Sequence, residues 1–94
     1  MALRKFVKDP NARLDYVIDW SAWLDAIGDT ITGAEVADPP AGLTVTTPIE
    51  FTSSNTTVWI AGGTAGVSYD VTVRITTAGG RVDDRTIVIA CKEL

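Results

Sequence analysis

The chain has 94 residues and a mass of 10.0 kDa, which is enough for one domain. Apolar residues make up 46 % of it and the mean hydropathy is +0.17, so the composition favours a folded core over disorder. With Cys91 as its one cysteine and with no histidine, the chain excludes an intrachain disulfide, a Cys₂His₂ zinc site and a histidine-based catalytic triad. We therefore expect no enzyme, no catalytic residues, no bound metal and no cofactor.

Charge is distributed unevenly along the chain. Residues 1–13 contain four basic side chains and one acidic side chain, whereas residues 14–94 contain four basic and eleven acidic ones. From Leu14 to Val73 the sequence contains no lysine or arginine. Because an acidic body repels phosphate backbones, we expect no nucleic-acid partner.

Hydropathy gives two further expectations. The apolar runs are all shorter than the roughly 18 residues that a membrane span needs, so we expect no membrane partner. The first ten residues also lack the apolar stretch of a signal peptide. Synthesis in a cytoplasm, with a free thiol, is the expectation that follows.

Residues 1–13 are expected to form a basic arm in front of a domain that spans residues 14–94. Asp9-Pro10-Asn11 marks a turn, because proline fixes φ and the flanking Asx side chains bond their own backbone. The arm mixes apolar and basic residues without a local explanation, namely Arg4, Lys5, Phe6, Val7 and Lys8. Two interpretations stay open: a frayed terminus, or a partner-binding peptide that adds a strand to an open sheet edge of a neighbouring subunit.

The domain begins with three predicted elements. Residues 14–20 alternate between apolar and polar side chains, which predicts a half-buried strand. Residues 21–27 have apolar side chains at helical spacing, which predicts one or two helical turns with Ser21 as a possible cap and Gly28 as the stop. Residues 29–37 predict a second strand, with a bulge at Thr32 to Gly33.

The middle of the chain predicts short strands between strong turns. Asp38-Pro39-Pro40-Ala41-Gly42 breaks the preceding strand, and Pro48 separates two short strands because proline belongs at an edge or a turn. These segments follow in the order strand 43–47, strand 49–52, turn 53–55, strand 56–61 and tight link 62–66.

The last third has the clearest pattern. Residues 69–76 alternate with a period of two, and residues 77–81 predict a hairpin loop because their glycines adopt positive φ at little cost. Residues 82–91 are the expected partner strand, with Ile87 and Ile89 on one face and Val88 and Ala90 on the other.

Seven short strands, with turns about every 8–12 residues, predict an all-β fold. We expect a single immunoglobulin- or fibronectin-III-like antiparallel β-sandwich of about seven strands with a short helical insert. Gly62-Gly-Thr-Ala-Gly-Val-Ser-Tyr69 resembles the corner before the sixth strand of fibronectin type III modules. In that role Tyr69 is a structural residue that ties the crossover to the core.

Carboxylates are the first candidates for chemistry. Asp15 and Asp19 share a strand face, and Asp83 and Asp84 lie beside a hairpin. Glycoside hydrolases use a pair of carboxylates for catalysis, and calcium sites use clustered oxygen ligands. The sequence has no dense Asp-x-Asp-x-Asp-Gly loop of the kind that binds calcium. Strand aspartates at alternate positions usually face water. We expect Asp83 and Asp84 to form surface ion pairs with Arg74, Arg81 or Arg85.

Two further motifs have ordinary explanations. The segment 62–66 is rich in glycine, but a phosphate-binding P-loop needs Gly-Lys-Ser/Thr leading into a helix, and here a strand follows. Asn55-Thr56-Thr57 matches a glycosylation sequon, which carries no meaning without a signal peptide.

The three tryptophans are candidate core or ligand residues. Trp20 and Trp59 are expected to be structural, because in so small a sandwich most tryptophans belong to the core. Trp23 lies on the helical insert and is expected to be partly exposed, which makes it a candidate for binding a partner. Cys91 lies in a strand pattern without an activating histidine, so inert packing is expected.

The order of several short motifs resembles a known family. They are Lys8-Asp-Pro10, Leu14-Asp-Tyr16, Ile18-Asp-Trp20, Trp23-Leu24, Gly28-Asp-Thr-Ile31, Gly42-Leu43-Thr-Val45, Thr57-Val-Trp59, Gly62-Gly-Thr-Ala-Gly66, Arg74-Ile-Thr-Thr77, Gly80-Arg81 and Asp83-Asp84-Arg85. Over residues 8–90 the chain thereby resembles the small bacteriophage proteins described as fiber–tail adaptors. The resemblance implies an immunoglobulin-like structural protein in the tail of a virion, and it brings no catalytic residues.

Three functions from different classes follow. The first is an adaptor that is made in the host cytoplasm, is present in several copies per particle and links fibers or other appendages to the tail by non-covalent docking. Its partners are tail and fiber subunits. The second is a capsid decoration or cement protein. The third is a carbohydrate-binding module that uses Trp23 or Trp59.

Overall fold

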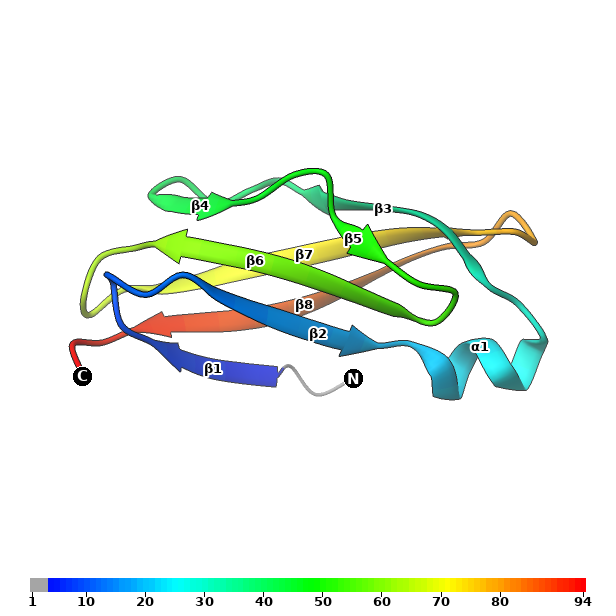
Figure 1. Cartoon of the computed structure of the whole chain (residues 1–94), viewed down its shortest axis with the longest axis horizontal. Coiled ribbons are helices and arrows are strands. Elements are labelled where there is room, and N and C mark those ends of the chain that lie inside the picture. The colour runs from blue at the N-terminus through cyan, green and yellow to red at the C-terminus, as the bar shows by residue number, and fades with distance from the viewer. Residues whose placement is uncertain (1–3) are drawn as a thin grey trace.

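The computed structural model describes residues 4–94, which form two packed β-sheets and one short helix (Figure 1). The elements in chain order are β1 Arg4–Lys8, β2 Leu14–Asp19, α1 Ser21–Ile27, β3 Ile31–Ala37, β4 Leu43–Val45, β5 Glu50–Phe51, β6 Asn55–Gly62, β7 Ser68–Thr77 and β8 Val82–Cys91.

The two sheets have different strand orders. Sheet A has the order β1-β8-β7-β3, and sheet B has the order β2-β6-β4 with β5 also paired to β6. β1 runs parallel to β8, and the other pairs are antiparallel. The all-β sandwich predicted from the sequence is therefore confirmed. In an immunoglobulin constant domain the orders are A-B-E-D and C-F-G. Assigning β2, β3, β4, β6, β7 and β8 to strands B to G reproduces the orders B-E-D and C-F-G, but β1 pairs with β8 in the other sheet and does not take the place of strand A beside β2.

Alternating side chains fill the space between the sheets. On β7 the odd-numbered residues from Tyr69 to Thr77 are buried, as the period of two predicts. Trp20 follows β2 and is fully buried, and its Nε1 donates a hydrogen bond of 3.1 Å to Thr56 Oγ1 on β6. The indole thus buries a large apolar area while its polar atom keeps a partner.

The first strand is not separate from the domain. Arg4 to Lys8 pair in register with Ile87 to Cys91 of β8, so the segment expected to be an arm is an edge strand of sheet A. The physical reason is its alternation: Phe6 packs against the core and Lys8 is fully buried, whereas Val7 is 52 % exposed. The basic residues at positions 4, 5 and 8 hide this period of two in the sequence. The first three residues of the arm lie outside the described part of the chain.

Lys8 is held by two backbone carbonyls. Its Nζ donates to the oxygen of Asp9 at 2.8 Å and to the oxygen of Gly62 at 2.7 Å. The expected turn follows directly, since Asp9 Oδ1 accepts a hydrogen bond from the backbone N–H of Asn11 at 2.8 Å. The chain then crosses from sheet A to sheet B and enters β2.

Local details of the predicted elements differ in places. Ser21 is the first helical residue rather than the cap. Trp20 takes the cap position without a side-chain cap hydrogen bond, and the Asp19 carboxylate accepts the Ser21 N–H at 2.9 Å. Gly28 ends α1 in the left-handed conformation, and β3 is irregular between Ile31 and Gly33, as expected. The strands on either side of Pro48 are shorter than predicted, since proline has no N–H for the sheet ladder.

We expect Phe6→Ala to lower the free energy of unfolding by about 2–3 kcal/mol, somewhat less than a fully buried aromatic residue, because Phe6 is only partly buried. Val7→Ala is the matched control on the outward side of the same strand, and its effect should stay within about 0.5 kcal/mol. Urea unfolding of both variants measures the difference. If both variants lowered the free energy of unfolding by the same small amount, β1 would not contribute to the stability of the folded domain.

Candidate functional site

Polar and nucleophilic side chains are the first groups to consider as a site. Among residues 4–94 there is no group of three or more His, Cys, Asp or Glu side chains placed to hold a metal ion. Cys91 is buried, with Sγ 3.9 Å from the Gly62 carbonyl oxygen. Asp84 forms a two-bond ion pair with Arg74, at 2.8 and 3.0 Å, as expected for that carboxylate. In the described part of the chain, no helix is long and apolar enough to cross a membrane.

The β1 edge is the first exposed surface. Of the five predicted arm residues, Phe6 and Lys8 are directed into the core of their own chain. Arg4, Lys5 and Val7 are exposed. Within residues 4–94, β1 pairs with β8 alone, which leaves its other edge open.

The three tryptophans lie in different environments. Trp20 is fully buried, but Trp59 is only partly buried and points outward from β6, so the expectation of a core role for Trp59 was wrong. The reason is that side chains alternate between the two faces of a strand. Val58 and Ile60 occupy the inward positions of β6, so Trp59 between them lies on the outer face. Trp23 is partly buried and packs against the core from α1, which leaves part of its ring accessible.

Arg13 covers the outward tryptophan. Its guanidinium carbon lies 4.6 Å from the centre of the Trp59 ring, a cation–π distance, and its Nη2 donates to Thr46 Oγ1 at 3.4 Å. The contact places a basic residue from before β2 on the outer surface of sheet B. No local sequence pattern signals this pairing, because the two residues are far apart in the chain.

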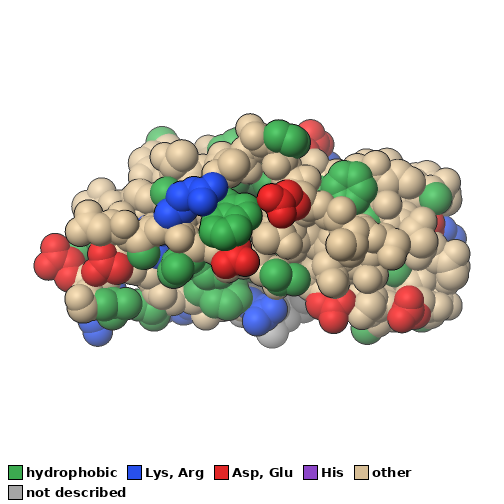
Figure 2. Space-filling view, in the orientation of Figure 1, with side chains coloured by type: hydrophobic (Ala, Val, Ile, Leu, Met, Phe, Trp, Pro, Cys, Tyr) green, Lys and Arg blue, Asp and Glu red, His purple; other side chains and the backbone are tan. Residues whose placement is uncertain are grey.

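An acidic surface surrounds this pair. We call the outward residues Asp15, Val17, Glu50, Thr57 and Trp59 the acidic face. Asp15 lies directly opposite Trp59 across β2 and β6, and Glu50 lies opposite Thr57 across β5 and β6. Val17 is 46 % exposed. Figure 2 shows hydrophobic side chains near the middle of this surface, over β6, with basic and acidic side chains beside them.

Tyr69 ties the loop before β7 to the domain. Its Oη accepts a hydrogen bond of 3.0 Å from the backbone N–H of Thr64, and the ring is buried. Gly63 has φ +97°, and a Cβ there would lie 3.4 Å from Tyr69 Cε2 and collide with Cys91 Sγ. The glycine-rich link therefore serves close packing around the tyrosine.

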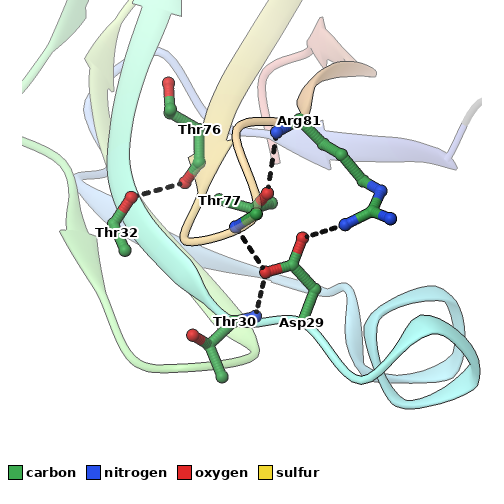
Figure 3. A network of polar contacts seen from close by, with 7 residues as sticks. Asp29, Thr30, Thr32, Thr76, Thr77 and Arg81 are labelled. Atoms are coloured by element: carbon green, nitrogen blue, oxygen red, sulfur yellow. Dashed lines mark hydrogen bonds and ion pairs between the residues drawn. The ribbon is translucent and has the colours of Figure 1, made fainter.

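Asp29 holds the far end of the β7–β8 hairpin (Figure 3). Its carboxylate accepts hydrogen bonds from the backbone N–H groups of Thr30 and Gly79, at 2.9 and 3.0 Å, and from Arg81 Nη1 at 2.9 Å. Hydrogen bonds lower the pKa of Asp29 from 3.8 to about 2, and the hydrogen bond with the Thr77 side chain has the largest effect. The sequence predicted the hairpin but not this carboxylate, which lies about fifty residues away.

The sequence matches the family of the podophage GP4 fiber-tail adaptor protein gp77 over residues 8–90, nearly the whole chain. The chain belongs to this fiber-tail adaptor family. It is therefore a structural component of a phage tail, and the family resemblance seen in the sequence is confirmed. No curated protein matches it. Four of the five residues of β1 precede the matched segment, so the family match covers β2 to β7 and most of β8 of this adaptor.

Tyr69→Phe should destabilise the adaptor by about 1 kcal/mol, because it removes the buried hydrogen bond to Thr64. Tyr16→Phe is a matched control, since Tyr16 Oη is buried and has no partner among the described residues. That change should be neutral or slightly stabilising. Thermal unfolding measures both, and equal effects would contradict the structural role of the Tyr69 hydroxyl.

The Asp29 contacts predict a specific pH dependence. Because folding lowers the pKa of Asp29, its ionised form adds stability that is fully present above pH 3.8 and is lost as the pH falls towards about 2. Asp29→Asn should therefore lower the melting temperature at pH 6, and the difference from the unmodified protein should shrink towards pH 2. Asp25→Asn on exposed α1 is the control. A difference that stays constant with pH would contradict the assignment.

Proposed function

We propose that this adaptor joins tail fibers or other appendages to the tail by non-covalent docking of a rigid sandwich, in several copies per particle, after synthesis in the host cytoplasm. Membership of the fiber-tail adaptor family supports the proposal. A preformed sandwich also loses little conformational freedom when it docks, which favours binding through fixed surfaces. The accessible part of Trp23 is a further candidate contact on this scaffold.

The open edge of β1 is the observation that carries the docking mechanism. The N–H of Lys92 donates to the carbonyl of Lys8 at 2.9 Å, so the peptide groups of Lys8 face β8. Successive peptide groups of a strand point to opposite sides. By this alternation the N–H and C=O groups of Lys5 and Val7 face away from β8, towards the open edge.

This edge suits an extended segment of a neighbouring virion protein. Added strands bind through main-chain hydrogen bonds and gain specificity from side chains. Here Arg4 and Lys5 favour an acidic neighbour, and Val7 adds an exposed apolar contact. Arg4 already lies 5.0 Å from the Phe6 ring centre, which holds its charge close to the strand.

Val7→Pro tests this edge. The change removes an outward N–H while keeping the ladder to β8, because proline is tolerated on edge strands. We expect the folded variant to lose incorporation at the tail of particles that lack the adaptor, measured by immunogold electron microscopy. Val7→Ile retains both the N–H and the apolar side chain and is the matched control, with incorporation within about twofold of the unmodified protein.

The outcomes separate the candidate functions. Unimpaired incorporation of Val7→Pro would contradict docking through the β1 edge. Gold spread over the capsid would instead favour the cement function, and binding of the isolated protein to glycans would favour the carbohydrate-binding module.

A further inference from the structure

Sheet B is built from the part of the chain that has no basic residues. Its strands lie between Leu14 and Gly62, inside the stretch from Leu14 to Val73 that contains no lysine or arginine. Asp15 and Glu50 therefore have no oppositely charged residue on their own sheet. Arg13, which comes just before β2, is the basic side chain that reaches this surface, and it is stacked on Trp59.

Sheet A differs, because Arg74 pairs with two of its outward acidic residues. Arg74 on β7 contacts Asp84 on β8 at 2.8 Å and Glu35 on β3 at 4.0 Å. Beside them, the hydroxyls of Thr72 and Thr86 share a hydrogen bond of 2.8 Å. The outer surface of sheet A thus satisfies much of its own charge, whereas the acidic face of sheet B does not.

The acidic face also has an apolar centre. The partly buried indole of Trp59 lies beside Val17, which is 46 % exposed, and Asp15 borders both. Tryptophan is enriched in protein interfaces, where the rim around the apolar centre is polar. The negative charge disfavours a phosphate-bearing partner.

A second copy of the chain does not fit this surface. In a two-fold contact each residue near the axis meets its own equivalent. Asp15 and Glu50 would then face the same acidic residues of the partner, and like charges in an interface are unfavourable. The charge pattern instead favours a surface of opposite sign.

We propose that the acidic face of sheet B is a second docking surface, separate from the β1 edge, and that it binds a tail protein whose surface has basic residues around an apolar contact. The inference rests on the proposed function, since it names the partner chemistry of an adaptor that docks at two places. Basic residues of the partner pair with Asp15 and Glu50, and an apolar side chain packs on Val17 and on the part of the Trp59 ring that Arg13 leaves accessible. The basic edge and the acidic face thus select neighbours of opposite charge.

Charge reversal tests the proposal. The probe is a tail purified from particles assembled without the adaptor, and the readout is the amount of added adaptor bound at low and at physiological salt. We expect Asp15→Lys to reduce binding at least tenfold at low salt and to weaken its salt dependence. Asp70→Lys is the matched control, because Asp70 is an exposed strand aspartate on the outer surface of sheet A. It should bind like the unmodified protein.

A second variant tests the apolar centre independently of charge. Trp59→Thr keeps a strand-compatible residue at an outward position, and we expect it to reduce binding at both salt concentrations. Melting temperatures confirm that each variant is folded before it is assayed. If Asp15→Lys is unfolded, Trp59→Thr carries the test alone.

The outcomes distinguish this inference from the proposed function. If the unmodified protein binds the tail and the folded acidic-face variants bind equally well, the second docking surface is wrong while the adaptor function stands. Equal losses for Asp15→Lys and Asp70→Lys would also overturn it, because they would report net charge alone. If the unmodified protein fails to bind the tail, both proposals fall.

Discussion

The fold depends on how the chain passes from sheet A to sheet B within its first fourteen residues. β1 belongs to one sheet and β2 to the other, and the connection is fixed by Lys8, whose ammonium bonds to the carbonyl of Gly62 at 2.7 Å. Gly62 ends β6, in the sheet opposite β1. A buried ammonium is costly without partners, so these carbonyl bonds specify one path for the chain. The edge of β1 and the face of sheet B take their positions from this crossing.

Chain order then determines which surface carries which charge. Arg4 and Lys5 lie exposed on the edge strand of sheet A, and the stretch without basic residues forms sheet B. Later arginines are used internally: Arg81 holds Asp29, and Arg85 lies 4.3 Å from the Trp20 ring and donates to the Asp19 carbonyl. The acidic residues of sheet B are left to face outward. The uneven distribution of charge along the sequence thus leaves basic side chains on the β1 edge strand and acidic side chains on the outer face of sheet B.

Sequence patterns correctly predicted the elements that are determined by neighbouring residues in the chain. The β7–β8 hairpin, the bulge near Gly33 and the helix stop at Gly28 follow from alternation and from glycine conformation, and the structure agrees. β1 was missed because a strand with one buried lysine resembles a charged tail. Trp59 was predicted to be in the core because aromatic residues favour burial, but the alternation of side chains along β6 directs it to the outer face. Contacts between distant residues, such as Asp29 with the hairpin, leave no periodic signal in the sequence.

Amide hydrogen exchange of the isolated protein tests the central claim most directly. If β1 is an integral edge strand with one side open, the amides of Phe6 and Lys8 face β8 and should exchange slowly, at rates like those of the β8 core. The amides of Lys5 and Val7 face solvent and should exchange quickly. We expect this alternating pattern of exchange rates over the four consecutive residues. Fast exchange at all four positions, as in an unstructured peptide, would contradict it.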